Sequence, residues 1–503
     1  MEMKLPKSSY NWTSILGASI AVIAFFLIVF FFVISVLFDQ GSSYMGLIIY
    51  IVLPIFMVIG MLLIPIGMLI QIRRNKKQLF ISEDMRWPRV DLNDQKHRNA
   101  FSLFVIVSFI FLFLSSIGSY EAFVYSESVP FCGTLCHEVM EPEYVTYQKS
   151  AHAKVACVEC HVGEGADWYM RSKLSGLYQV YAVTVNNFPR PIPTPLANLR
   201  PARETCEHCH WPEKFYPNRI KNEQHFLADE NNTEWNIQLT MKTGPDHHTQ
   251  KLSEGIHWHI NPNVKIEFMS ADNKSEYIQW VKYTNKATGE EHIFEDTMME
   301  PDSTFFADGK LHEMDCMDCH NRPSHGYLSP PDFVDAAMSS KEVDPQIPYI
   351  KLAAMEALKG TYSTKDSADL LIAQTVLNFY KENYPDKGAE HEANILKAIE
   401  GIKIAYHENT FPEMNVRWDA YPNHKSHMET QGCFRCHDNN HSTKDGRIIS
   451  KDCNLCHSIT AQGKPDSLQM AFTNQKMEFI HPVDIGTDWK EYSCVDCHAY
   501  LYP

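Results

Sequence analysis

The sequence has 503 residues and a formal net charge of −16, with 45 Lys and Arg against 61 Asp and Glu. Residues 1–118 hold ten basic and six acidic residues, which leaves 35 basic and 55 acidic residues for the remainder. This acidic excess argues against nucleic acid as a partner and favours small cations or proteins with basic patches, although an acidic surface equally serves to keep a domain soluble.

The first part of the chain contains three long segments without a charge, at residues 15–38, 45–72 and 101–118. About 20 apolar residues cross a bilayer, so we predict three transmembrane helices. The first is too long for a signal peptide and has no cleavage signal after it, so we expect it to be retained. Basic residues precede the first segment and fill the loop 73–100, which predicts that this loop is cytoplasmic and that residues 119–503 lie outside.

Beyond the third segment, pairs of cysteines are each followed at once by a histidine. The first copy, Cys132/Cys136/His137, has one extra residue between its cysteines, and six strict C-x-x-C-H copies follow: Cys157/Cys160/His161, Cys206/Cys209/His210, Cys316/Cys319/His320, Cys433/Cys436/His437, Cys453/Cys456/His457 and Cys494/Cys497/His498. Two thiols that bind a porphyrin and a histidine that binds its iron are typical of haem c. Zinc sites and disulfides do not require a histidine after every second cysteine. The motifs use all 14 cysteines and predict seven covalently bound haems.

The segments between the motifs predict secondary structure of two kinds. Residues 222–310 alternate in places, and residues 277–294 predict a β-hairpin. Residues 331–408 predict helices at 367–384 and 390–407, separated by Pro385. The predicted fold class is therefore three transmembrane helices plus a mostly α or irregular multihaem cytochrome c domain with a small β insert.

These patterns also predict domain boundaries. We expect a membrane anchor at 1–118, a four-haem domain at 119–330 with its β insert near 222–310, a helical insert at 331–412, and a three-haem domain at 413–503.

A low-spin haem iron needs a second axial ligand, and histidines outside the motifs are numerous. The candidates are His152, His225, His257, His259, His325, His427, His441 and His481, with His312 in reserve. His325 and His441 follow a motif histidine so closely that each would serve a neighbouring haem. For each candidate, a surface or hydrogen-bonding role is the alternative. His208 lies inside the third motif and should point away from iron. Met140 could bind the first iron through its thioether or pack against the porphyrin.

Several of these stretches together resemble a known family. They are residues 128–140, Tyr144, residues 150–152 and 157–161, Lys173, the third motif and residues 316–325. They resemble NapC/NirT-type membrane quinol dehydrogenases over roughly residues 100–325. Those relatives have four haems and usually one membrane helix. The seven motifs and the long C-terminal extension are more similar to the larger inner-membrane cytochromes of that family (ImcH-like).

The resemblance implies that a quinol, menaquinol or ubiquinol, is oxidised near the first haem with Lys173 close by. The acidic residue expected shortly after this lysine is absent, since residues 174–185 contain no carboxylate. Glu138, Glu164 and Asp167 are therefore the candidate proton acceptors.

Together these observations predict a quinol dehydrogenase of the bacterial cytoplasmic (inner) membrane with its haem domain in the periplasm. It would pass electrons to periplasmic c-type cytochromes or a periplasmic reductase in anaerobic or extracellular respiration. One alternative is a terminal reductase of a small nitrogen compound such as nitrite, with one five-coordinate haem. Another is a passive electron-relay subunit of a larger complex.

Overall fold

The computed structural model describes most of the chain in two compact units. The described residues are 7–38, 52–78, 91–163, 165–194, 200–211, 218–244, 255–272, 274–299, 301, 305–306, 309–472, 475 and 477–500. The first unit comprises residues 1–140 with 156–158, and the second comprises residues 141–155 with 159–503.

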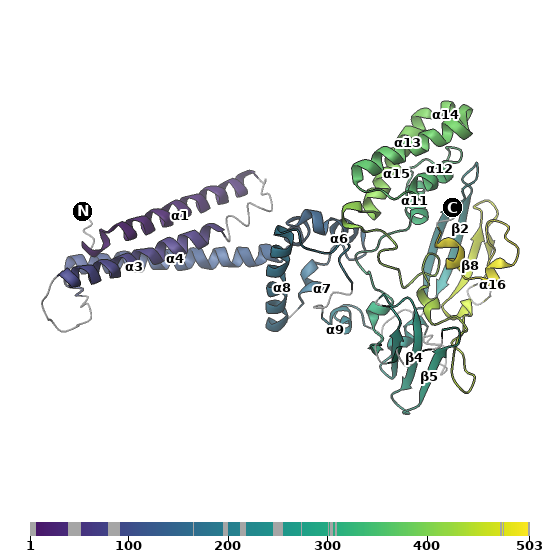
Figure 1. The fold of residues 1–503 in the computed structure, drawn as a ribbon, viewed down its shortest axis with the longest axis horizontal. Helices are drawn as coiled ribbons and strands as arrows, with labels where there is room; N and C mark the ends of the chain where they lie inside the picture. The colour runs from purple at the N-terminus through teal and green to yellow at the C-terminus, as the bar shows by residue number, and fades with distance from the viewer. Residues whose placement is uncertain are drawn as a thin grey trace. The chain divides into compact units, whose positions relative to one another are not determined.

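The first unit contains the three predicted apolar helices. They are α1 (Trp12–Phe38), α3 (Leu53–Gln78) and α4 (Gln95–Ser126), and each is long and apolar enough to cross a membrane (Figure 1). Pro65 lies inside α3 without ending it. The helix α4 begins after Asp94, whose side chain accepts a hydrogen bond from the Lys96 amide. Large apolar side chains such as Phe104 and Phe109 are 68% and 70% exposed, as expected for a surface that faces lipid.

Small residues let α1 and α3 pack closely. A methyl group added at Gly17 would lie only 2.6 Å from the Gly60 carbonyl oxygen. Nearby, the Ser14 hydroxyl donates a hydrogen bond to the Ile64 carbonyl at 2.9 Å. Such close backbone approach and interhelical hydrogen bonding are typical of helix pairs in membranes, where apolar burial alone does not hold helices together.

Short helices carry the motifs that follow α4. These helices are α5 (Val129–Thr134), α6 (His137–Lys149), α7 (Cys157–His161) and α9 (Ala202–Cys206), which contain residues of the first three motifs. The longer helix α8 (Ala166–Thr184) and the short helix η1 (Lys7–Ser9), which precedes the anchor, contain no motif residue. The later motifs lie on η5 (Cys316–Asp318), η7 (Gly432–Arg435), η8 (Cys453–Leu455) and α17 (Cys494–His498), and η4 (Ile256–Ile260), η6 (Pro412–Met414) and α16 (Asp488–Glu491) complete the short helices. A single turn is long enough to bring the two cysteines and the histidine of one motif to the same side.

Two antiparallel sheets form part of the second unit. One has the order β1 (Arg219–Phe226), β2 (Glu234–Met241), β8 (His457–Gly463), β9 (Gln469–Met470). The other has the order β6 (His312–Glu313), β3 (Val264–Ser270), β4 (Ile278–Asn285), β5 (Glu291–Asp296), β7 (His441–Ser442). The predicted hairpin is confirmed, with Tyr283 opposite His292. Each sheet combines strands that precede residue 330 with strands that follow residue 412. The domain boundaries predicted at these two residues stay predictions.

The helical insert has its own apolar core. It consists of α11 (Pro330–Ser339), α12 (Ile350–Leu358), α13 (Lys365–Asn383), α14 (Pro385–Glu390) and α15 (Glu392–Asn409), drawn in green in Figure 1. Ile350, Met355, Ile372 and Ile402 are wholly buried in it. The two predicted helices are confirmed as α13 and α15, and Pro385 begins the short helix between them because proline is tolerated in a first helical turn.

A buried polar cluster links this insert to β1. The Lys351 ammonium group is almost fully buried and is paired with the Asp335 carboxylate. Asp335 also accepts a hydrogen bond from the Phe226 amide at 3.2 Å and lies 3.3 Å from His225 Nδ1. A buried charge is stable only when it is paired and hydrogen-bonded, and this cluster meets both conditions.

Candidate haem centres

Each histidine of the six strict motifs faces a second histidine ring. The pairs and the distances between ring centroids are His161 with His325 (6.2 Å), His210 with His152 (6.1 Å), His320 with His257 (6.3 Å), His437 with His259 (5.9 Å), His457 with His427 (6.2 Å), and His498 with His481 (6.2 Å). An iron bonded at about 2 Å to a ring nitrogen on each side, with about 1.1 Å from nitrogen to centroid, requires about 6.2 Å between centroids. The residues present therefore fit a bis-histidine iron at each of the six pairs.

Hydrogen bonds orient many of these rings. The Nδ1 atom lies against a backbone carbonyl oxygen in six of them: His152 against Pro323, His257 against Thr243, His259 against Ile256, His325 against Glu143, His437 against Ser450, and His481 against Val483. A ring that donates its Nδ1–H to a carbonyl has its other nitrogen, Nε2, available as a lone-pair donor. Metal-binding histidines commonly have this arrangement.

Burial keeps several of these rings neutral. It lowers the pKa of His320 and of His457 to about 4. It also lowers the pKa of His161, His259 and His325 below the ordinary value. A metal ligand must offer an unprotonated nitrogen, so an environment that disfavours the imidazolium form suits iron binding.

The motif cysteines form no disulfides, and consecutive motifs are neighbours. Cys132 hydrogen-bonds to Cys157 and lowers its pKa to about 7, and Cys206 hydrogen-bonds to Cys316. Electrostatic interactions connect the other successive motifs, between Cys160 and Cys206, Cys319 and Cys433, Cys433 and Cys456, and Cys453 and Cys494. The seven motifs thus form a continuous series in chain order.

The motif cysteines differ in how far the polypeptide covers them. Cys160, Cys209, Cys453 and Cys497 are exposed, whereas the other motif cysteines are partly buried. Cys209 and Cys497, like Cys160 and Cys453, have solvent-exposed thiols, and this exposure does not test their predicted role as cofactor-binding residues. Their bonds to haem stay a prediction that depends on the C-x-x-C-H spacing alone.

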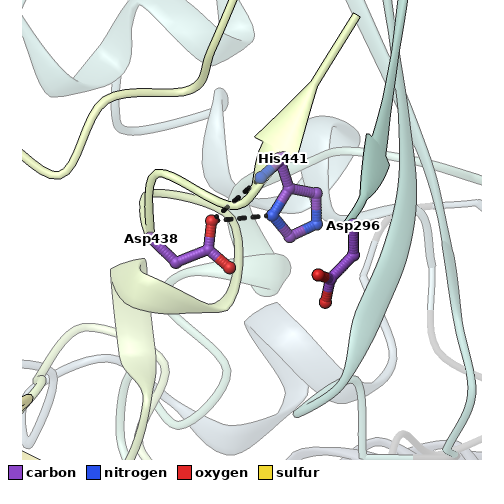
Figure 2. Close-up of side chains that lie close together, drawn as sticks. All are labelled: Asp296, Asp438 and His441. Carbon is purple, nitrogen blue, oxygen red and sulfur yellow. Dashed lines mark hydrogen bonds and ion pairs between the residues drawn. The ribbon is translucent and has the colours of Figure 1, made fainter. Parts of the chain in front are cut away.

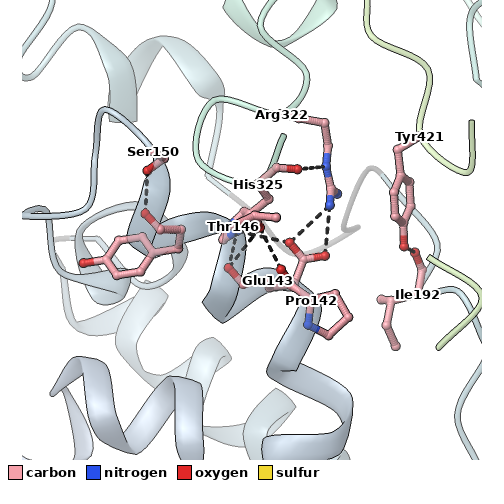
Figure 3. Close-up of polar contacts among 9 residues, drawn as sticks. Pro142, Glu143, Thr146, Ser150, Ile192, Arg322, His325 and Tyr421 are labelled. Carbon is pink, nitrogen blue, oxygen red and sulfur yellow. Dashed lines mark hydrogen bonds and ion pairs between the residues drawn. The ribbon is translucent and has the colours of Figure 1, made fainter. Parts of the chain in front are cut away.

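An ion pair lies behind the ring of His325 (Figure 3). The Glu143 carboxylate accepts hydrogen bonds from Arg322 Nη2 at 3.0 and 3.1 Å and lies 3.1 Å from His325 Nδ1. The Arg322 guanidinium in turn stacks on the Tyr421 ring, 4.1 Å from its centroid. Glu143 could not be recognised from the sequence, because nothing in the spacing of α6 shows that it contacts a residue so distant in the chain.

His441 and His225, also predicted as ligands, have other partners. The His441 ring is fully buried, with Nδ1 3.0 Å from Asp438 and Nε2 2.9 Å from the Ile278 carbonyl oxygen (Figure 2). Asp296 lies beside them and completes a group whose ligand atoms are within 4.8 Å of one another. His225 bonds to Asp335. Among the described residues no ring contact pairs His441 or His225 with a motif histidine, although His225 interacts electrostatically with His498, so iron binding by these two rings stays a prediction.

The residues predicted around the first centre are divided between the units. Glu138 is exposed in the first turn of α6, and Met140 is half-buried on the same helix. Lys173 and Asp167 lie on α8, where the Lys173 ammonium group is 5.0 Å from the centroid of the Tyr169 ring. Glu164 and the side chain of His137 lie outside the described residues.

Two further histidines named from the sequence also have positions. His312, the reserve ligand, bonds through Nε2 to Asp318 at 3.1 Å. His208, expected to point away from iron, is exposed.

Comparisons with known proteins decide the family. Residues 94–191 match the N-terminal region of the NapC/NirT cytochrome c family. The chain is also 40% identical to the cytochrome c-type protein ImcH of Geobacter sulfurreducens over 499 residues. These residues make up 99% of this chain and 97% of that protein. The chain belongs to the NapC/NirT family of cytochromes c.

A second NapC/NirT-type relative covers less of the chain. The cytochrome c-type protein NrfH of Wolinella succinogenes is 30% identical over 122 residues, which are 24% of this chain and 68% of that protein. No solved structure matches the chain. Both the resemblance to this family and the predicted fold class are confirmed. As a NapC/NirT cytochrome, the protein carries covalently bound haem and transfers electrons at the inner membrane.

Proposed function

We propose that this cytochrome oxidises menaquinol or ubiquinol at the outer face of the cytoplasmic membrane and delivers the electrons to a soluble periplasmic acceptor. The acceptor is a c-type cytochrome or a periplasmic reductase. The observation that best supports this proposal is the series of six facing histidine pairs, which follows the membrane-proximal first motif. Each bound haem supplies one-electron transfer, and the protein supplies placement, axial ligands and electrostatics.

The first motif is the proposed entry point because the chain reaches it directly after α4. Only five residues separate the end of α4 at Ser126 from Cys132, so this motif remains close to the bilayer surface. Its Cys132 thiol forms a hydrogen bond with Cys157 of the second motif. Electrons that enter here have a neighbouring centre to move to, and the C-terminal motif at Cys494–His498 is the proposed exit.

Oxidation of a quinol to a quinone releases two electrons and two protons, so the site also needs proton acceptors. We assign the acceptance of protons to the carboxylates Glu138, Glu164 and Asp167. Lys173 would bind the quinol, because its ammonium group can donate a hydrogen bond to a quinol oxygen. Met140 remains a candidate second ligand for the first iron. The basic loop at residues 73–100 supports a position of these groups on the outer side of the membrane.

Anaerobic mixing of the purified protein with a menaquinol analogue tests the proposal, with the haem absorption bands followed in time. We expect rapid reduction of the wild-type protein and slower reduction of Lys173→Ala. The matched control Lys154→Ala removes an exposed lysine of the second unit and should behave as wild type. Dithionite should reduce all three proteins equally.

Two outcomes would change the proposal. A wild-type protein that dithionite reduces but quinol does not would be an electron relay rather than a dehydrogenase. A shift of the haem bands on addition of nitrite or carbon monoxide would support a terminal reductase. The six histidine pairs argue against that alternative, because they provide a ligand on both faces of six of the irons.

A further inference from the structure

The helix α8 exposes a continuous apolar stripe. Along this stripe Met170, Leu174, Leu177, Tyr178 and Tyr181 are 56%, 61%, 68%, 65% and 60% exposed. Their spacing of four, three, one and three residues places them on one side of the helix, on a stripe about 100° wide. In a water-soluble domain such a stripe normally packs into the core, so its exposure indicates a surface that contacts something other than water.

The flanks of this stripe have the composition of a membrane interface. At 100° per residue, Arg171 and Lys173 fall on its two edges. Each of these cations lies over an aromatic ring, Arg171 at 5.2 Å from Trp168 and Lys173 at 5.0 Å from Tyr169. Aromatic and basic side chains beside an apolar stripe are typical of helices that lie at the level of lipid headgroups.

The charge of the surrounding chain points to the same partner. Residues 168–203 contain five basic and no acidic residues, although residues 119–503 carry a net charge of −20. An anionic lipid surface attracts such a basic segment and repels the remainder of the domain. The transmembrane helix α4 ends at Ser126, 40 residues before α8 begins, so the chain is already anchored to a bilayer near this point.

We propose that α8 lies flat in the headgroup layer of the bilayer. Its apolar stripe faces the acyl chains, and Arg171 and Lys173 extend to the phosphate groups on either side. This contact adds an interfacial attachment to the transmembrane helices and fixes the orientation of the haem domain. The same contact holds Lys173 at the depth of a quinol headgroup, and this consequence rests on the proposed function.

Photo-crosslinking to lipid tests this proposal on the full-length haem-loaded protein. The protein is placed in nanodiscs of phosphatidylglycerol and phosphatidylcholine that contain a lipid with a diazirine on its acyl chain, and labelled peptides are mapped by mass spectrometry. We expect label on α8 as well as on α1, α3 and α4. The substitution Leu177→Glu should reduce the label on α8 several-fold and leave the label on the other helices unchanged.

The matched control is Gln179→Glu, which adds the same charge at an exposed position on the opposite side of α8. It should retain wild-type labelling, and Leu174→Glu should repeat the effect of Leu177→Glu. Unchanged haem spectra and circular dichroism show that the variants are folded. Wild-type protein without label on α8, or Leu177→Glu with wild-type labelling, would overturn the proposal, as would crosslinks from α8 to another protein in place of lipid.

The labelling does not depend on quinol oxidation, so the two proposals can fail separately. If α8 is labelled but quinol does not reduce the protein, the proposal of an interfacial helix stands and the proposal of a quinol dehydrogenase fails. If quinol is oxidised rapidly but α8 is not labelled, the proposal of a quinol dehydrogenase stands and the proposal of an interfacial helix fails.

Discussion

At the scale of single residues, Glu143 lies where it would influence one candidate haem centre. Its carboxylate is held by Arg322 and lies 3.1 Å from Nδ1 of His325, whose ring faces His161. A carboxylate behind a metal-binding imidazole raises the basicity of that ligand and stabilises the more positive oxidised metal. The centre at His161 should therefore have a lower reduction potential than its pair of histidines alone would give.

The substitution Glu143→Gln should raise the potential of this one centre. We expect an increase on the order of 50 mV, which corresponds to ~1.2 kcal/mol for one electron and to the loss of one charge-assisted hydrogen bond. Spectroelectrochemical titration of the purified protein measures it. Glu141→Gln is the matched control, because Glu141 lies on the same helix and pairs with Lys365 rather than with a histidine. Equal effects of both variants would rule out this role for Glu143.

His225 gives stability a dependence on pH. Burial alone would lower its pKa, but the hydrogen bond and the charge of Asp335 raise the pKa above the ordinary value of 6.5. The bound proton therefore stabilises the fold fully below pH 6.5, and this contribution is lost as the pH rises through the higher folded pKa.

The substitution His225→Gln should lower the thermal unfolding temperature more at pH 6 than at pH 9. The difference should be modest, about 2 °C, because the ring is partly exposed to solvent. Differential scanning calorimetry across this pH range measures it. A difference between the two proteins that does not change with pH, or that grows as the pH rises, would contradict the assignment of the proton to His225.

The residue scale also shows how far the sequence could predict the centres. The motifs specify their own histidines, because covalent attachment requires a fixed local spacing. His325 and His441 looked equivalent, since each closely follows a motif histidine. In the fold one faces His161, whereas the other bonds to Asp438 and Ile278. The difference between His325 and His441 arises from the long-range pairing of β7 with β5. The local spacing of the sequence contains no information about this pairing.

At the scale of elements, η4 connects two centres. His257 faces His320 and His259 faces His437, although only one residue separates the two ligands. Residues two apart on a 3₁₀-helix point in different directions, so one short element can reach two irons. Trp258 stacks on Tyr283 of β4 between them, which holds η4 against the sheet.

Replacing either ligand of η4 should affect one haem only. We expect His257→Ala and His259→Ala each to convert one low-spin haem to a high-spin form, because one axial position opens. Electron paramagnetic resonance measures the high-spin signal, and the double variant should show twice the intensity. His292→Ala is the control, since that ring stacks on Tyr283 and faces no motif histidine among the described residues. A high-spin signal in the control, or none in the two variants, would contradict the pairing.

Local signals account for the elements that the sequence predicted. The helix α13 has a capping box at Thr364 and stops before Pro385, and both features are visible in the sequence. The hairpin of β4 and β5 joins neighbouring segments. The pairing of β2 with β8 joins Leu239 to Ile459, which are far apart in the chain. Alternation of side chains reveals a strand but does not identify its partner, so these sheets could not be assembled from the sequence.

At the scale of the whole molecule, the membrane anchor and the remainder of the chain differ in the sign of their net charge. The chain has a net charge of −16, but residues 1–118 hold ten basic and six acidic residues, and residues 168–203 hold five basic and no acidic residues. The remaining acidic surface should attract a basic electron acceptor over long distances and speed its encounter with the protein. Salt screens such attraction, since the Debye length falls from about 30 Å at 0.01 M to about 8 Å at 0.15 M.

Electron delivery to a basic cytochrome c should therefore slow as the salt concentration rises. We expect the second-order rate constant to fall about ten-fold between 10 and 200 mM salt. Stopped-flow mixing of the reduced protein with the oxidised cytochrome measures it. An acidic electron acceptor is the control, because its rate should increase over the same range. A rate for the basic acceptor that does not respond to salt would show that surface charge does not guide the encounter.

The order of the histidine pairs along the chain has a consequence for biosynthesis. In five pairs the facing histidine precedes its motif, as His152 precedes His210 and His481 precedes His498. In the remaining pair His325 follows His161. If residues 119–503 cross the membrane in chain order, both histidines of these five pairs would be available as soon as the motif itself has crossed. A haem bound at His161 would lack its second histidine until the fourth motif and His325 had followed, and its open axial position would meanwhile be accessible to other ligands.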